Sequence, residues 1–250
     1  MKKPSYIKKS AFFACTVMCI LFATATAGCT SPPLVRGNGR IQTKSFSLKD
    51  FTAVSLGGKW EAEIRQGEKF NVEIDIDDNL FDYLDVYVSD KTLHIETERG
   101  INIRSTRSRV TVTMPSLTAF RGAGSVRTDI RGFNDLTRDV SVHVSGSGTV
   151  NADISVKSLT VKASGSSSFT LKGKTEDFSA SISGSGKIRA FDFKADNVDM
   201  HISGSGSAQV HAEKTLNARI SGSGSLVYTG TPRLDINTSG SAKVVSASRN

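Results

Sequence analysis

Apolar and polar residues alternate in short runs through the second half of the chain, and each run ends in a segment of Gly and Ser. The tetrapeptide SGSG, or one of the variants SGSS and SGSA, starts at Ser145, Ser164, Ser183, Ser203, Ser221 and Ser239. Successive starts lie 19, 19, 20, 18 and 18 residues apart. A flexible linker does not keep such a period, so these segments indicate a structural repeat.

The residues before each tetrapeptide form apolar and polar columns when the repeats are aligned on its first Ser. The column five residues before this Ser is apolar throughout: Val140, Leu159, Phe178, Val198, Leu216 and Leu234. The column two residues before it is polar throughout: His143, Lys162, Ser181, His201, Arg219 and Asn237. The columns three and one before it are again apolar, except for one Thr. Alternation with a period of two predicts a β-strand with one buried face.

The same alternation resumes after each tetrapeptide, with apolar residues five and seven positions after its first Ser, such as Val150 and Ala152. Each repeat therefore holds two strands that face inward, joined by a Gly-Ser corner. A unit of 18–20 residues cannot bury its own apolar face, whereas stacked units form a continuous core. The prediction is an all-β protein, a parallel β-helix or β-solenoid with one repeat per coil.

The glycines of the corners are expected to have structural roles. Glycine adopts positive φ without strain and lets the backbones of successive coils approach closely, while the Ser hydroxyls form a row along the corner. FRGAGSVRTDI at 120–130 aligns with VSGSGTVNADI at 144–154, which adds an earlier coil followed by the insertion GFNDLTRD. The predicted corner glycines are Gly122, Gly124, Gly146, Gly148, Gly165, Gly184, Gly186, Gly204, Gly206, Gly222, Gly224 and Gly240.

The first part of the chain lacks this period but contains further alternating runs, as in WEAEIRQGEKFNVEIDI, KTLHIETE and RVTVTM. These runs predict a less regular β module at residues 46–116, followed by the solenoid repeats at 117–250. No long helical periodicity follows residue 45.

The N-terminal segment is typical of an export signal, because four Lys residues precede the apolar stretch AFFACTVMCILFATATA. TAGC at 26–29 resembles a bacterial lipobox, in which cleavage leaves a Cys that carries lipid. We therefore expect a signal peptide at 1–28, then a lipidated Cys29 and a tether that reaches residue 45. Ala25-Thr26-Ala27 is itself an A-x-A site, so cleavage before Gly28 is the alternative.

Removal of the signal changes the charge and the cysteine content. It takes away four Lys and no acidic residue, so the net charge falls from +8 to +4. So small an excess does not favour nucleic acid as a partner. Cys15 and Cys19 leave with the signal, and Cys29 alone forms no intrachain disulfide. Apolar burial and backbone hydrogen bonds are then expected to stabilise the mature chain.

No residue pattern predicts catalysis. Secreted β-helix enzymes that cleave polysaccharides need clustered carboxylates on an outer face, whereas the outward columns of the repeats are mixed. Asp75, Asp77 and Asn79 have the spacing of a calcium loop. Leu80 stands where that loop needs Gly, however, and Val86 where it needs Glu. We predict no catalytic residue, no metal site and no cofactor.

Two further features have both a functional and a structural interpretation. The segment RGINIRSTRSR gathers Arg99, Arg104, Arg107 and Arg109. It suits contact with an anionic glycan or lipid headgroup, or a solvated loop with local ion pairs, which is the preferred interpretation. Trp60 is the only Trp. It suits glycan stacking or, as we expect, packing in the core beneath one strand.

Several segments together resemble a known family of bacterial envelope proteins. They are FTAVSLGGKWEAEIRQGE, NLFDYLDVYVSDKTLHIET, VTVTMPSLTAFRGAGSV and the serial SGSG coils. In this order they resemble the family named for the putative auto-transporter adhesin head GIN domain, as one continuous domain over residues 46–245. The resemblance implies a right-handed β-helix on exported, frequently lipid-anchored proteins, with adhesion as the expected role. It implies no catalytic residues.

We therefore expect a non-catalytic, lipid-anchored adhesin of the cell envelope, whose solenoid presents a binding or scaffolding surface. Its expected partners are the membrane, through the lipid, and a glycan or an envelope protein, but not nucleic acid. The expected location is the outer membrane, facing the periplasm or the cell surface. The alternatives are a carbohydrate-active β-helix enzyme and a self-assembling envelope scaffold, since an open solenoid end exposes unpaired strand edges.

Overall fold

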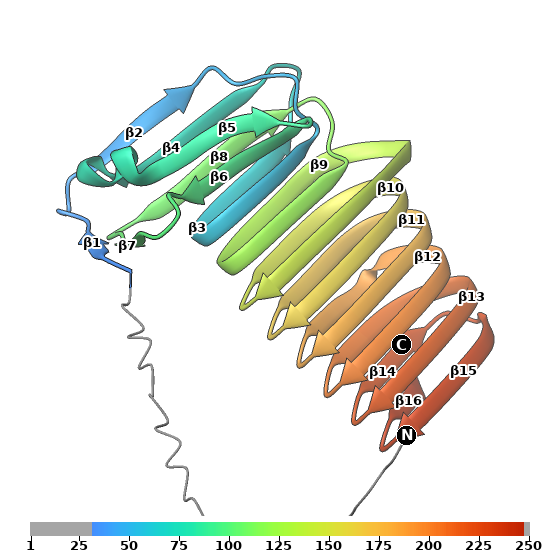
Figure 1. The fold of residues 1–250 in the computed structure, drawn as a ribbon. Helices are drawn as coiled ribbons and strands as arrows, with labels where there is room; N and C mark the ends of the chain where they lie inside the picture. Colours follow the sequence, from blue (N-terminus) through green and yellow to red (C-terminus); the bar gives the residue numbers. More distant parts are fainter. Residues whose placement is uncertain (1–31, 248–250) are drawn as a thin grey trace, which may run out of the picture. The chain divides into compact units, whose positions relative to one another are not determined.

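In the computed structural model, which describes residues 32–247, the chain is an all-β protein (Figure 1). Strands make up 76% of the described residues and helix 3%, and the strands form a β-solenoid of about 6 turns. This confirms the predicted fold class. The described residues contain one short 3-10 helix, η1 (Asp78–Tyr83), and no helix in this part of the chain is long and apolar enough to cross a membrane.

Five long strands make the regular part of the solenoid: β9 (Ala119–Gly146), β10 (Thr149–Gly165), β11 (Ser168–Gly184), β12 (Lys187–Gly204) and β13 (Ser207–Gly222). Each pairs with the next in parallel, so equivalent positions of the repeat stack on one another. Gly165, for example, lies in register with Gly184. Figure 1 shows the result as a row of stacked bands.

Each coil has one arm before its Gly-Ser corner and one arm after it, and the apolar columns of both arms fill the space between them. Leu159 and Val161 before a corner are fully buried, and Phe169 and Leu171 after it are at most 1% exposed. In a single coil, these side chains would be exposed to solvent on the two faces that the neighbouring coils now cover. The core therefore exists only because the coils stack.

The parallel stacking begins earlier in the chain than the sequence repeat does. β3 (Ala53–Gln66) pairs in parallel with the first half of β9. Gly58 of β3 lies in register with Gly124, so it occupies the corner of a first coil. The expected boundary between residues 116 and 117 is therefore no break in the sheet, since the first coil comes from the N-terminal module.

The N-terminal end of the solenoid is closed by further strands. β6 (Thr92–Thr97) and β8 (Ser108–Met114) lie parallel to β3, on its first and second halves. Antiparallel strands follow outward, β5 (Leu84–Ser89) on β6 and β4 (Asn71–Asp77) on β8. We call these strands, with the two described next, the cap.

Two strands of the cap come from the segment expected to be a tether. β1 (Leu34–Arg36) pairs with β7 (Asn102–Arg104), and β2 (Ile41–Phe46) is antiparallel to β4. Within the segment 29–45 that was expected to be a tether, the residues from Leu34 onward therefore belong to the cap.

The other end of the solenoid is open in the described chain. β14 (Ser225–Thr229) and β15 (Arg233–Gly240) pair with β13, and β16 (Lys243–Ser246) pairs with β14. Leu234 of β15 is 44% exposed, whereas Leu216, in the same column one coil earlier, is fully buried. This end thus presents strand edges and a half-covered apolar column.

The glycine after the first Ser of each tetrapeptide has a positive φ and a close neighbour. Its φ lies between +92° and +111° in Gly146, Gly165, Gly184, Gly204, Gly222 and Gly240. A Cβ on Gly204 would lie 2.7 Å from the carbonyl oxygen of Gly184 in the coil below. That carbonyl accepts a hydrogen bond from the N–H of Ser205 at 3.0 Å. A side chain here would therefore strain the backbone and disturb the bond between two coils.

The second glycine of the corner is required for a different reason from the one expected. Its φ is not positive in Gly148, Gly186, Gly206 or Gly224. A Cβ on Gly224 would instead lie 2.7 Å from Cγ2 of Ile202 and 2.9 Å from Cγ2 of Ile220. The position takes glycine because core side chains already fill the space.

The expected place of Gly122 is also corrected. Its φ is not positive, and a Cβ on Gly146 would lie 2.6 Å from the carbonyl oxygen of Gly124. Gly124 is thus the corner residue, two positions after the one that the alignment gave. The alignment had matched Gly122 and Gly124 to Gly146 and Gly148, whereas the register places Gly124 beneath Gly146. The extra residues of this coil lie later, between Arg131 and Asp139 of β9.

One coil carries Ser167 where its neighbours have the second glycine. The inward residue before the corner of this coil is Ala163, whereas the next two coils have Ile182 and Ile202. The smaller side chain leaves room for a Cβ. Ser167 is 2% exposed, however, and its hydroxyl has no hydrogen-bond partner among the described residues. A buried, unpaired hydroxyl lowers stability.

The substitution Gly204→Ala tests the corner stacking. We expect the free energy of unfolding to fall by about 3 kcal/mol or more, because Ala must adopt a positive φ and displace the carbonyl of Gly184. Gly100→Ala is the matched control, since Gly100 has a φ of +81° but nothing within 4 Å of an added Cβ. Its loss should be about 1 kcal/mol. Equal losses in chemical denaturation would contradict the close approach of the coils.

The substitution Ser167→Ala removes the unpaired hydroxyl. We expect the free energy of unfolding to rise by up to about 1 kcal/mol, since no hydrogen bond is lost and a buried polar group is removed. Ser166→Ala, at an exposed corner position, should change it by less than about 0.5 kcal/mol. A clear loss of stability in Ser167→Ala would mean that the hydroxyl has a partner.

Candidate functional site

The residues singled out in the sequence fall in different places. Cys29 lies outside the described residues. The corner glycines follow one edge of the solenoid, where they shape the backbone. Within residues 32–247, no group of three His, Cys, Asp or Glu side chains is placed to hold a metal ion.

The acidic turn at the end of β4 joins parts of the cap. Asp77 is fully buried, and its carboxylate accepts hydrogen bonds from the N–H groups of Gly39 and Thr106, both at 2.7 Å. The hydroxyl of Thr106 donates a third, at 2.8 Å. Burial opposes ionisation, but these hydrogen bonds outweigh it and hold the pKa of Asp77 below its usual value. Asp77 therefore fastens two loops to the sheet.

The neighbouring acids of the turn have other partners. Asp75 accepts a hydrogen bond from the hydroxyl of Thr43 at 2.7 Å. Asp78 forms an ion pair with Arg40 at 3.3 Å and accepts a hydrogen bond from the side chain of Asn38. These contacts attach the segment around the start of β2 to the turn, so they stabilise the cap.

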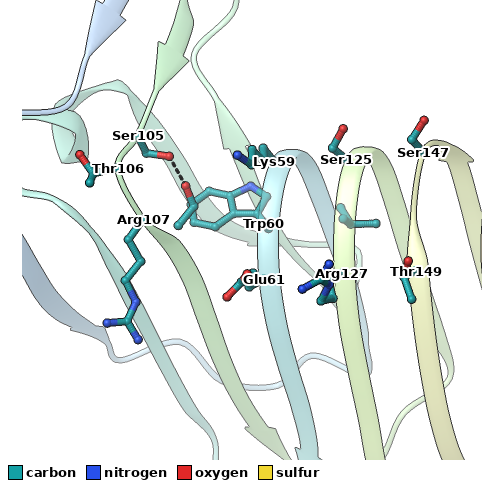
Figure 2. A pocket seen from close by; sticks show the side chains of 12 residues that line it. Lys59, Trp60, Glu61, Ser105, Thr106, Arg107, Ser125, Arg127, Ser147 and Thr149 are labelled. Carbon is teal, nitrogen blue, oxygen red and sulfur yellow. Dashed lines mark hydrogen bonds between the residues drawn. The ribbon is translucent and has the colours of Figure 1, made fainter.

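A hollow of about 320 Å³ lies at the start of the solenoid, on the side of the Gly-Ser corners (Figure 2). The corners of β3, β9 and β10 line one side of it, and the loop at 105–108 lines the other. In Figure 2, Ser125 and Ser147 stand at the bends of successive coils, with Arg127 and Thr149 beside them. The hollow is therefore the N-terminal end of the corner that runs through the repeats.

Trp60 borders the hollow without offering its ring as a stacking surface. The residue is 2% exposed, and its indole N–H donates a hydrogen bond to the carbonyl of Gly57 at 2.9 Å. The burial agrees with the expected core packing. Trp60 thus lines the hollow as a buried side chain, and its hydrogen bond to Gly57 stabilises the turn before the first corner.

Exposed cations line the hollow, together with one acid. Lys59, Arg107 and Arg127 are the cations, and Glu61 is the acid. Sequence reasoning missed Lys59 and Arg127. The alignment of 120–130 with 144–154 places Arg127 against Asn151, whereas in the structure it lies beside Thr149, so its column could not be read from the sequence.

The arginine-rich segment has more than one role. Arg107 lines this hollow, and Arg104 lines a second one, of about 680 Å³, that shares Lys59, Trp60 and Ser105 with it. Arg109 instead lies on β8, in register with Glu61 of β3 on one side and with Asp75 of β4 on the other. Two of these arginines therefore face hollows, and a third lies between acids of the sheet.

The groups of the hollow suit binding. Guanidinium and ammonium groups bind carboxylate, sulfate or phosphate, and Ser and Thr hydroxyls both donate and accept hydrogen bonds. Glu61 is the one acidic residue among those that line the hollow. Glycoside hydrolysis, by contrast, uses a pair of carboxyl groups.

Comparison with known proteins relates these features to a family. The family model described as "Putative auto-transporter adhesin, head GIN domain" matches residues 50–232. The matched span contains the stacked coils from β3 to β13 and the hollow at their start. No curated protein matches the sequence.

Crystal structures of bacterial proteins match nearly the whole chain. A putative lipid binding protein from Parabacteroides distasonis is 26% identical, with a TM-score of 0.73 over 86% of this chain and 100% of that one. A putative adhesin from Bacteroides fragilis is 21% identical, with a TM-score of 0.80 over 85% and 100%. A putative adhesin from Parabacteroides merdae is 23% identical, with a TM-score of 0.63 over 86% and 100%. The cap and solenoid together are thus a shared fold.

The substitution Asp77→Asn tests the carboxylate of the cap. At neutral pH we expect the free energy of unfolding to fall by about 2–3 kcal/mol, because two buried N–H groups lose a charged acceptor. The folded pKa of Asp77 is lowered, so its stabilisation is present above the ordinary value of 3.8 and is lost as the pH falls through the folded pKa.

The difference between wild type and Asp77→Asn should therefore shrink in acid, as measured by denaturation at neutral pH and below the ordinary value of 3.8. Asp75→Asn is the control, because the partner of Asp75 is a hydroxyl at the surface, and it should cost about 1 kcal/mol or less. A difference that stays constant with pH would contradict the role of the Asp77 charge.

Proposed function

The chain belongs to the head GIN domain family of putative auto-transporter adhesins, and on this premise we propose that it is a non-catalytic adhesin of the cell envelope, anchored by lipid at Cys29. The observation that carries the proposal is the hollow at the start of the solenoid. Its cations Lys59, Arg107 and Arg127, together with corner serines, suit an extended polar ligand better than a reaction.

The solenoid supports adhesion because it holds side chains from many coils at a fixed spacing. Successive strands lie about 4.8 Å apart. Backbone hydrogen bonds join the coils at the corner, as from the N–H of Ser147 to the carbonyl of Gly124 at 2.9 Å. A ligand that lies across several coils then meets a preformed surface, which lowers the entropic cost of binding.

Lipid anchoring is supported by the TAGC segment at 26–29 and by the short stretch after it. The residues TSPP separate Cys29 from β1, which begins at Leu34. So short a link would keep the cap close to the membrane surface. The outer membrane is the proposed location, since the signal directs export and the family is one of adhesins.

A second candidate function, assembly into an envelope scaffold, is favoured by the open end of the solenoid. Leu234 and Val245 are 44% and 37% exposed there, and unpaired strand edges join readily to other strands. The cap closes the other end, so two copies would meet at their open ends. Sizing chromatography tests this candidate, because an apparent size that stays constant over a wide concentration range would exclude it.

The substitution Cys29→Ser tests the anchor. Cells grown with a palmitate analogue should label the wild-type protein and leave Cys29→Ser unlabelled, because the thiol is the proposed site of lipid attachment. The variant should also move from the membrane fraction to the soluble fraction. Equal label in both proteins would show that Cys29 does not carry the lipid.

Adhesion itself is tested with cells that differ only in this protein. We expect cells with the wild-type protein to attach to glycan-coated surfaces more than cells that lack it, and more than cells with Cys29→Ser, which would release the protein. Digestion of intact cells with protease before the assay should abolish the difference. Equal attachment by all three strains would refute adhesion as the function.

A further inference from the structure

The Gly-Ser corner carries an unusual set of outward side chains. Four positions face outward around the corner glycine of each coil: three and one residues before it, and one and three residues after it. From β9 to β16 these positions stack in register, as in His143 beside Lys162 and Arg127 beside Thr149. We call this surface the corner edge.

The corner edge contains cations and hydroxyls but no carboxylate. Its Lys and Arg residues are Arg121, Arg127, Lys162, Lys187, Arg219 and Lys243. Its other positions are taken by Ser, with a few Thr, His, Asn and Ala, and Asp and Glu occur at none of them. The ion pairs of Lys and Arg among the described residues lie elsewhere, as in Arg138 with Asp135 at 3.0 Å. One acid borders the edge, because the carboxylate of Asp199 lies 3.5 Å from the ring of His201.

The electrostatic consequence is visible at His143. Its pKa lies below the usual value, because of partial burial and because Lys162 and Arg121 repel a proton on the ring. Both cations belong to the same column as His143 and lie on the neighbouring coils. The corner edge is thus a line of positive potential on a chain whose mature net charge is small.

The hydroxyls of the corner edge form two exposed rows. Ser145, Ser164, Ser183, Ser203 and Ser221 stand directly before the corner glycines, and Ser147, Ser166, Ser185, Ser205 and Ser223 directly after them. The backbone N–H groups of the second row bond to the coil below, as from Ser166 to Gly146 at 3.0 Å. The hydroxyls are therefore held at the strand spacing of about 4.8 Å and face solvent.

We propose that the corner edge binds an acidic polysaccharide laid along the solenoid axis, with its carboxylates on the Lys and Arg residues and its sugar hydroxyls on the serine rows. This deepens the proposed adhesin function and rests on it. The hollow lined by Lys59, Arg107 and Arg127 would receive one end of the bound chain, because it opens at the first coils of the same edge.

The arrangement of the edge favours a polysaccharide over other anions. Arg121 and Lys162 are two coils apart, or about 10 Å, and Lys162 and Arg219 are three apart, or about 14 Å. Acidic sugars that alternate with neutral ones present widely spaced charges of this kind, whereas duplex DNA carries one charge per about 1.7 Å. The edge also has no Phe, Tyr or Trp for stacking bases and no large apolar residue for entering a membrane.

The proposal is tested with the purified protein and defined polymers. Hyaluronate, in which acidic and neutral sugars alternate, and polygalacturonate, in which every sugar is acidic, are the acidic probes. Dextran is the neutral one, and single-stranded DNA represents the other class of polyanion. We expect binding to an acidic polysaccharide that weakens with added salt, little binding to dextran, and weaker binding to DNA. Binding to neither acidic probe, or tighter binding to DNA, would overturn the proposal.

Charge reversal locates the surface. Lys162→Glu combined with Arg219→Glu should reduce the affinity for the acidic probe about tenfold or more. The matched control is Lys157→Glu combined with Lys174→Glu, at exposed positions away from the Gly-Ser corner, which should change it by less than about twofold. An equal loss in both double variants would overturn the proposal, because the effect would then be one of overall charge.

A second variant keeps every cation in place. Ser183→Asp adds one carboxylate to the serine row between Lys162 and Arg219, and it should also weaken binding to the acidic probe. An unchanged affinity would contradict a ligand that lies across this row. The cells that carry the protein could adhere while the purified protein binds neither acidic probe. That result would support the adhesin function and refute this assignment of its ligand.

Discussion

The structure depends on the close approach of glycine to glycine at the corner. From Gly58 to Gly240, each corner residue has a positive φ, and from Gly124 onward an added Cβ would lie 2.6–2.9 Å from the carbonyl oxygen of the glycine below. This contact sets the register of one coil on the next. The register in turn aligns the apolar columns that make the core and the polar columns that make the surface.

The sequence revealed the regular coils because the corner tolerates so few residues. The apolar columns and the Gly-Ser period predicted strands and stacking between β10 and β15, and burial as far as β13. The second glycine of each corner could be recognised in the sequence, but the reason for glycine at this position could not. The requirement for glycine depends on the volume of residues such as Ile202 and Ile220 inside the coil. Ser167 follows the same rule, because the small side chain of Ala163 leaves room there for a Cβ.

The sequence did not predict the first coil, in which Gly58 is the corner residue, and the reasons are physical. Gly58 follows another glycine and lacks the flanking serines, and the chain leaves β3 to build most of the cap before it returns in β9. A period cannot be seen across such an excursion. The hollow could not be predicted from the sequence either, because Arg107 lines it from a loop and Lys59 lines it from a strand far away in sequence. The corner edge was also not predicted, because the outward columns are mixed and because the places of Arg121 and Arg127 depend on a register that the alignment missed.

The contrast between the closed and the open end bears on how such a chain can change its length during evolution. Each regular coil contacts the coils above and below through the same glycines, serines and apolar columns, so one more coil would meet the same neighbours. Duplication of one gene segment of this size would lengthen the protein without altering the cap. The corner edge would then lengthen by one coil at a time. Selection could therefore act on the length of this surface without changing the fold.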